Sequence, residues 1–204
     1  MTTTYCTNAE LRAQLNIQDP DSRLDAIIEA TSRAIDQWCG QFFYDSGSAT
    51  ARVFKATDED ELSVHPFSTT TGLVVKTDTG NSGTFDNTWT VTTDYVAAPE
   101  SGYDSAGLAV PYDTILAVGS RCFPTWDDRA RVQVTARWGW STVPAAVKEA
   151  CIIKAARLYR RRDVMEDTGG GFGAMGLFRI GQREDPDVVA LLGPFRNVDD
   201  WVIR

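Results

Sequence analysis

The chain has 204 residues, 43% of them hydrophobic, which is enough for one substantial domain or for a small domain that carries a large insertion. Acidic residues (28) outnumber basic ones (20), and the net charge of -8 argues against nonspecific binding to a phosphate backbone. The first residues show no signal-peptide pattern and no segment is apolar enough to cross a bilayer. We therefore expect a soluble, unexported protein without membrane contact.

The first 50 residues predict two helices. Thr7 or Asn8 is suited to cap a short helix that ends near Leu15. A longer amphipathic helix is expected from about 22 to 39, and Gly40 tolerates the left-handed conformation of a helix stop. The apolar face expected for this second helix consists of Leu24, Ile27, Ile28, Thr31, Ile35 and Trp38. A face of this size needs a partner surface.

Residues 51–140 are rich in Thr, Val, Gly, Asp and aromatic residues, with short alternating runs between turn sequences. The candidate strands are 52–56, 61–65, 73–77, 89–93, 114–118 and 131–140. The last is the most regular, because its apolar residues recur at every second position, as in a half-buried strand. These residues are Val132, Val134, Ala136, Trp138 and Trp140. We predict an antiparallel β module inserted between the second and third helices.

A third helix is predicted after Pro144, whose missing N–H costs nothing in the first helical turn, and Ser141 or Thr142 is available to cap it. The residues expected to be buried are Val147, Ala150, Cys151, Ile153, Ala155 and Leu158. The helix is expected to end in a basic run that complements the helix dipole, formed by Arg157, Arg160, Arg161 and Arg162. Such an end either lies in water or contacts an acidic surface of a neighbouring copy.

The C-terminal part begins with a segment, 163–176, that contains five glycines and has no apolar periodicity, so we expect it to be adaptable. Residues 177–180 are candidates for an extended segment. Asp185 and Pro186 then start a short helix. The last residues are apolar again, which is typical of a docking element.

The predicted class is α+β, with a helical core of three main helices and a short C-terminal helix, interrupted by an antiparallel β module. We assign 1–50 to the N-terminal core helices, 51–140 to the inserted module, and 141–163 to the third core helix. Residues 164–204 are assigned to a flexible loop and a C-terminal docking arm.

No constellation of catalytic residues emerges. Four scattered cysteines and one histidine, His65, give no zinc-ligand spacing, and Cys39 and Cys151 are expected to be small buried hydrophobic residues. Residues 171–176 match GxGxxG formally, but a helix precedes them instead of a strand, so a dinucleotide site is not expected. The acidic cluster 58–61 lacks the spaced ligands of a calcium loop. We predict that the protein is not an enzyme and needs no cofactor or metal.

Five segments carry a family resemblance through their order and spacing. They are 5–7 (YCT), 30–40 (ATSRAIDQWCG), 138–144 (WGWSTVP), 155–162 (AARLYRRR) and 185–192 (DPDVVALL). Together they resemble head-to-tail connector (adaptor) proteins of long-tailed bacteriophages, and the similarity covers nearly the whole chain.

The resemblance implies a structural virion protein, located at the neck beside the portal vertex and assembled in the host cytoplasm. It implies a homo-oligomeric ring of about twelve copies that joins the portal protein to a downstream neck or tail protein. DNA would pass through this ring without specific binding, past a channel rich in carboxylates.

The partner-binding residues expected from this resemblance, toward the portal or a neighbouring subunit, are Arg160, Arg161, Arg162, Phe178, Leu191, Leu192, Phe195 and Trp201. Two alternatives remain open at this stage. Another neck or tail ring protein, such as a stopper or a tail terminator, shares the acidic balance but relies more on β structure. A non-viral carbohydrate-binding β module could use Trp89, Trp126 and Trp140 as stacking platforms.

Overall fold

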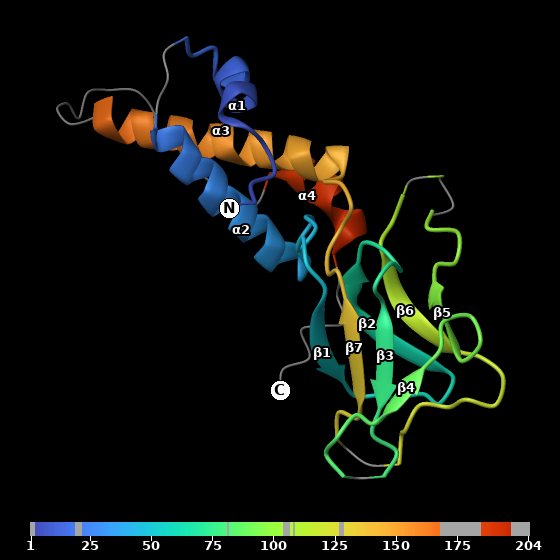
Figure 1. The fold of residues 1–204 in the computed structure, drawn as a ribbon. Helices are drawn as coiled ribbons and strands as arrows, with labels where there is room; N and C mark the ends of the chain where they lie inside the picture. The colour runs from blue at the N-terminus through green and yellow to red at the C-terminus, as the bar shows by residue number, and fades with distance from the viewer. Residues whose placement is uncertain are drawn as a thin grey trace. The chain divides into compact units, whose positions relative to one another are not determined.

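The computed structural model describes residues 3–18, 22–80, 82–103, 107, 109–126, 129–167 and 185–196, with only the backbone described for 162–167. The chain forms two compact units (Figure 1). The helical unit comprises Met1–Phe43 and Val143–Arg204, and the β unit comprises Tyr44–Thr142. The predicted α+β class, with an antiparallel β module between helices, is therefore confirmed. The β unit begins before and ends after the predicted range 51–140, since it comprises residues 44–142.

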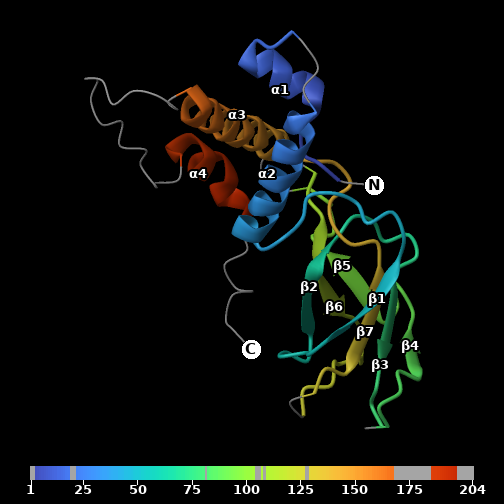
Figure 2. The same cartoon turned by 90° about the vertical axis from the view of Figure 1, so that its left-hand side faces the viewer.

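The long helix α3 is the centre of the helical unit. The helices are α1 (Asn8–Leu15), α2 (Arg23–Cys39), α3 (Ala145–Asp167) and α4 (Pro186–Leu192), followed by the 3₁₀ turn η1 (Gly193–Phe195). Helices α1, α2 and α4 all contact α3, and both views show α2 crossing it and α4 alongside it (Figures 1 and 2). Residues far apart in the sequence therefore share one small core.

Local signals set the ends of α1 and α2 as predicted. The Thr7 hydroxyl accepts a hydrogen bond from the Glu10 N–H, and the Glu10 carboxylate accepts one from the Thr7 N–H, which completes a capping box. Asn16 ends α1 with a left-handed φ of 58°, and Gly40 ends α2 with a φ of 70°. Both stops use residues that adopt this conformation at low cost.

The apolar faces of α2 and α3 are buried for most of their length. On α2, Leu24, Ile27, Ile28, Thr31 and Ile35 are buried as predicted, while Trp38 is half-buried. On α3, Val147, Ala150, Cys151 and Ala155 are buried. The prediction was wrong for Leu158, which is 41% exposed, and Ile153 is only half-buried. Both side chains remain accessible because the other described residues cover the apolar stripe of α3 only as far as Ala156.

Two antiparallel sheets make up the β unit. The strands are β1 (Thr50–Phe54), β2 (Glu61–Phe67), β3 (Val74–Thr77), β4 (Asn87–Trp89), β5 (Tyr95–Ala98), β6 (Tyr112–Ala117) and β7 (Val132–Ala136). One sheet has the order β1-β7-β3-β4 and the other the order β2-β6-β5. Strand β7 lies inside the first sheet, with β1 and β3 on either side, so it is buried as its alternating sequence indicates.

The alternation predicted for 131–140 is confirmed, because Val132, Val134, Ala136, Trp138 and Trp140 are all buried. The predicted length was wrong, since β7 ends at Ala136. Trp138 forms only an isolated bridge with Phe67, and the positive φ of Gly139 (99°) takes the chain out of the strand conformation.

Strand β5 was not predicted. Its sequence, Tyr95 to Ala98, is apolar throughout and too short to show an alternation of apolar and polar residues. The predicted strand 89–93 also differs from the structure, where β4 ends at Trp89. Thr92 adopts a left-handed φ of 66° and donates its N–H to the Tyr95 carbonyl, so a turn occupies this position.

Candidate partner-binding site

The basic run of α3 lies within the helix and not at its end. Helix α3 continues to Asp167, so the prediction that the arginines complete it was wrong. No proline or glycine occurs between Arg160 and Asp167 to stop the helix. Arg160 and Arg161 are exposed, whereas the side chain of Arg162 lies outside the described part. The helix therefore presents cations on its side, where a neighbouring surface can contact them.

Helix α4 begins with a well-formed cap. The Asp185 carboxylate accepts a hydrogen bond from the Asp187 N–H at 3.0 Å, and Pro186 occupies the first turn. The second oxygen of Asp185 lies 2.8 Å from Nη1 of Arg157, on α3. Because Asp185 is only 8% exposed, this one carboxylate both starts α4 and joins it to α3.

The structure uses part of the predicted docking arm internally. Leu192 was predicted to contact a partner. It is only 1% exposed, because its own helical unit covers it. Leu191 and Phe195 are half-buried. The Phe195 ring packs edge-on against Phe43 at 5.7 Å, and its carbonyl accepts a hydrogen bond from Gln41. Residues 185–196, part of the predicted loop and docking arm, therefore form α4 and η1 within the helical unit.

Two of the predicted docking residues, Phe178 and Trp201, lie outside the described residues. Within the described part of the helical unit, the large hydrophobic side chains that are exposed are Leu158 (41%) and Val189 (38%). Burial was predicted for Leu158, because it occurs in an apolar helical stripe, and no prediction was made for Val189. Their exposure adds apolar surface to a helix pair that also presents Arg160 and Arg161.

Replacing Asp185 with alanine is expected to destabilise α4 by about 1 kcal/mol, because the N-terminal amides lose their cap. The loss of the Arg157 pair adds little, since Arg157 is 59% exposed and water screens its charge. Amide hydrogen exchange in α4 should become several-fold faster. Asp185→Asn is the matched control, because asparagine retains the cap and removes the charge. Equal acceleration in both variants would contradict the assignment to capping.

The N-terminal segment before α1 is held on α2 by a polar cluster. The Tyr5 hydroxyl donates to the Asp36 carboxylate and accepts a hydrogen bond from the Phe43 N–H at 2.9 Å. Arg33 pairs with Asp36 at 3.1 Å and donates to the Thr3 carbonyl at 2.7 Å. Burial raises the pKa of Asp36 above its ordinary value. No sequence signal connects Tyr5 with Asp36, so this cluster could not be predicted.

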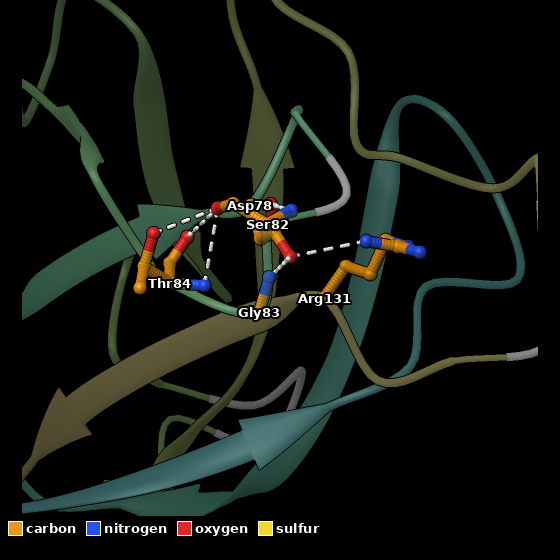
Figure 3. Close-up of polar contacts among 5 residues, drawn as sticks. All are labelled: Asp78, Ser82, Gly83, Thr84 and Arg131. Carbon is orange, nitrogen blue, oxygen red and sulfur yellow. Dashed lines mark hydrogen bonds and ion pairs between the residues drawn. The ribbon is translucent and has the colours of Figure 1, made fainter.

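The β unit contains a buried ion pair that joins a turn to a strand. Asp78 follows β3 and Arg131 precedes β7, and their side chains, only 5% and 2% exposed, meet at 3.0 Å (Figure 3). The Asp78 carboxylate also accepts hydrogen bonds from the N–H groups of Ser82 and Gly83. The Trp126 ring lies 4.2 Å from the Arg131 guanidinium carbon. This arrangement positions the β3–β4 turn.

The tryptophans do not form the stacking platforms that a carbohydrate-binding module requires. Trp89 is 4% exposed and stacks on Phe123 with the ring centres 4.7 Å apart, and Trp140 is 8% exposed. Trp126 is 57% exposed. Since two of the three rings are buried, the structure gives this alternative no support.

Searches for two other kinds of site give negative results within the described residues. No three His, Cys, Asp or Glu side chains there are grouped in a way that could hold a metal ion. None of the helices in that part of the chain has both the length and the apolar character that crossing a bilayer requires.

Comparison with known proteins identifies the fold. No family model and no curated protein matches the chain. Among solved structures, a chain in the neck of an empty GTA (gene transfer agent) particle with C6 symmetry matches with a TM-score of 0.53 and 21% identity. A chain in the neck of a native GTA particle with C12 symmetry matches with a TM-score of 0.52 and 22% identity. Each match covers 96% of this chain and 91% of the other.

The helical unit with its β insertion is thus a fold that occurs in the necks of phage-like particles. The resemblance to phage connector proteins is confirmed at the level of the fold.

Proposed function

We propose that this chain is a structural neck protein of a phage or phage-like particle. The observation that carries the proposal is the fold similarity to two neck chains over almost the entire length of both partners. A similarity that included only the helices would fit many proteins. Here both the helical unit and the inserted β unit match the neck chains. The similarity is therefore not explained by one common motif that occurs in unrelated proteins.

The more specific role is that of an adaptor ring of about twelve copies between the portal and the next neck or tail protein. The symmetry of the neighbouring particles, C6 and C12, is compatible with this number. The net charge of -8 supports passage of DNA through such a ring, because carboxylates repel phosphates. Assembly would take place in the host cytoplasm, and the ring would act in the virion.

The exposed side of α3 is the surface that we assign to subunit contact. Arg160 and Arg161 are exposed there, and Leu158, between these arginines and the buried part of the helix, is 41% exposed. An acidic copy of the same chain supplies carboxylates for the arginines, and an apolar contact would cover Leu158. Arg162 follows in the same basic run.

The C-terminal residues are assigned to the portal. Because Val188 and Leu192 of α4 are buried in the helical unit, we assign the main contact with the portal to residues outside 185–196. That leaves the segment with Phe178 and the terminal residues with Trp201 as the apolar anchors. Leu191 and Phe195, each half-buried, can contribute at the margin of the contact.

Electron microscopy of the purified chain, alone and with the portal protein, tests the proposed function. We expect rings on the portal vertex, with carboxylates predominating along the central channel. Connectors of this kind are often monomeric before they meet the portal, so the decisive sample is the mixture. Rings that form only on a tail protein would favour a stopper or tail terminator, and a channel lined mainly by Lys and Arg would contradict the proposed passage of DNA.

Deletion of residues 197–204 is expected to abolish portal attachment while the helical unit still folds, because the cut leaves α4 and its buried residues in place. Trp201→Ala should weaken attachment to the portal by at least about tenfold, because it removes the indole group that we assign as an anchor. Tyr103→Ala, which removes an aromatic ring that is 58% exposed in the β unit, is the matched control and should leave attachment unchanged. Undiminished attachment after the deletion would refute the assignment of the arm.

A further inference from the structure

The helical unit brings two thiols together that are far apart in the sequence. Sγ of Cys6, in the segment before α1, lies 3.6 Å from Sγ of Cys151 on α3. The two residues are 145 positions apart and are 3% and 0% exposed. Burial of Cys151 agrees with the expectation from its place in the apolar stripe of α3. Its contact with a second thiol was not expected, because no CxxC spacing or other local pattern links them.

The surroundings of this pair make its two thiols unequal. The hydrogen bond between the sulfurs, together with burial, raises the pKa of Cys6. The same contact lowers the pKa of Cys151. Cys151 is therefore the more acidic thiol of the pair, and Cys6 is the less acidic thiol beside it. Two sulfurs 3.6 Å apart, one of which deprotonates more easily than the other, are arranged for the formation of a disulfide.

We propose that Cys6 and Cys151 are a covalent modification site, which a small disulfide oxidant converts into an intrachain disulfide bond. Cys151 loses its proton, and the thiolate so formed attacks one sulfur of the oxidant, which gives a mixed disulfide and releases the first oxidant thiolate. Cys6 then loses its proton and attacks the Cys151 sulfur, which releases the second. The two cysteines lose two electrons and two protons in total, and the oxidant takes up both and leaves as two thiols.

The fold allows this reaction although both sulfurs are buried. The segment from Thr3 to Thr7 is not helical. It is held by the Tyr5 N–H bond to the Ser32 hydroxyl at 3.1 Å and by the polar cluster around Asp36, so the oxidant reaches the sulfurs only when these contacts open. Local opening of this segment admits the oxidant, and the reaction should therefore be slow. On closure the sulfurs need to approach from 3.6 Å to about 2.0 Å, a short distance for a segment outside regular structure.

The bond would tie the N-terminal segment to α3 and would restrict the unfolded chain, because the loop it closes contains most of the protein. One consequence rests on the proposed function: a neck protein is made in a reducing cytoplasm and works after the particle has been released, where disulfides persist. The bond would then stabilise the neck after release. Formation of the bond in the isolated chain is independent of that function.

The test uses the full-length chain with Cys122→Ser, which removes the exposed thiol of the β unit. After incubation with glutathione disulfide, the protein is denatured, alkylated and analysed by mass spectrometry. We expect the mass to fall by two hydrogens and a cross-linked peptide to join Cys6 to Cys151. The Tm should rise by on the order of 5 to 10 °C and return to its original value with dithiothreitol.

Cys6→Ser and Cys151→Ser, each in the Cys122→Ser background, should abolish the bond, whereas Cys39→Ser, at another buried cysteine, should leave it intact. The proposal is overturned if Cys6 and Cys151 both remain alkylatable after prolonged oxidation, or if either pairs with Cys39 instead. No portal or tail protein is present in this assay. Absence of the disulfide would therefore not contradict the proposed neck function, and failure to form rings would not contradict the disulfide.

Discussion

The Tm of the β unit is expected to fall by on the order of 10 °C when Asp78 is replaced by asparagine. Asparagine preserves the shape of the side chain, and its single acceptor oxygen can keep the bond from the Ser82 N–H at the expense of the one from the Gly83 N–H, which uses the other oxygen. The buried guanidinium of Arg131, however, then faces a neutral amide in place of a carboxylate 3.0 Å away. Loss of one charge from a buried pair is costly because the remaining charge has already lost its hydration. Scanning calorimetry of the full-length chain measures the effect.

Asp94→Asn is the matched control for this substitution. Asp94 also accepts a hydrogen bond from a turn N–H, that of Thr90, and pairs with an arginine, Arg121, at 2.9 Å. The difference is exposure, since the Arg121 side chain is 40% exposed and its charge remains hydrated. The control should lose less than about 4 °C. Equal losses from both variants would show that burial of the Asp78–Arg131 pair has no special importance.

The Asp78–Arg131 pair should make the stability of the β unit depend on pH. Burial alone would raise the pKa of Asp78, but hydrogen bonds from Gly83 and Ser82 and the charge of Arg131 hold it below its ordinary value. The resulting stability is fully present above the unfolded-state pKa of about 3.9 and is lost as the pH falls through the folded-state pKa. The Tm difference between the native chain and Asp78→Asn should therefore be constant near neutral pH and shrink in acid. A constant difference across the whole range would contradict this linkage.

Trp138→Ala is expected to lower the free energy of unfolding of the β unit by about 3 to 5 kcal/mol. The Trp138 side chain is fully buried, and its ring lies 5.7 Å from that of Phe54 and 6.3 Å from that of Phe67. Its Nε1 donates to the Thr50 carbonyl at 2.9 Å, so truncation removes a hydrogen bond as well as packing. Hydrogen exchange of the amides in β1 and β7 measures the loss.

Trp126→Ala is the control with the same change in side-chain volume. The Trp126 ring is 57% exposed, and its described interaction is the cation–π contact with Arg131 at 4.2 Å. We expect a loss of about 1 kcal/mol or less. If both tryptophan variants lost similar stability, the core of the β unit would have to lie somewhere other than around Trp138.

Much of the fold could be predicted because its signals are local. The capping box of Thr7 and Glu10, the stop at Gly40 and the start at Pro186 all depend on residues that are neighbours along the chain. The alternation in 132–140 identified a buried strand because side chains of a strand point to opposite faces in turn. The short apolar strand β5 carried no such pattern and was missed.

Less of the candidate site could be predicted. The pattern identified Arg160 and Arg161 as exposed cations, but it treated Leu158 as buried and Leu192 as available to a partner. Both errors have one origin. An apolar stripe shows that a helix face prefers burial, and it does not show whether another part of the same chain covers that face. Here α4 is covered by its own unit, while the stripe of α3 extends beyond its cover.

The amino-acid sequence by itself determined the helices, most of the strands, the acidic balance and the order of elements that resembles a phage connector. Only the tertiary structure decided which distant residues meet: Tyr5 with Asp36, Cys6 with Cys151, and Asp78 with Arg131. The physical reason is the separation of the interacting residues along the chain. Caps, stops and alternation arise from interactions between near neighbours, whereas these pairs exist only after the packing of whole elements has brought the chain segments together.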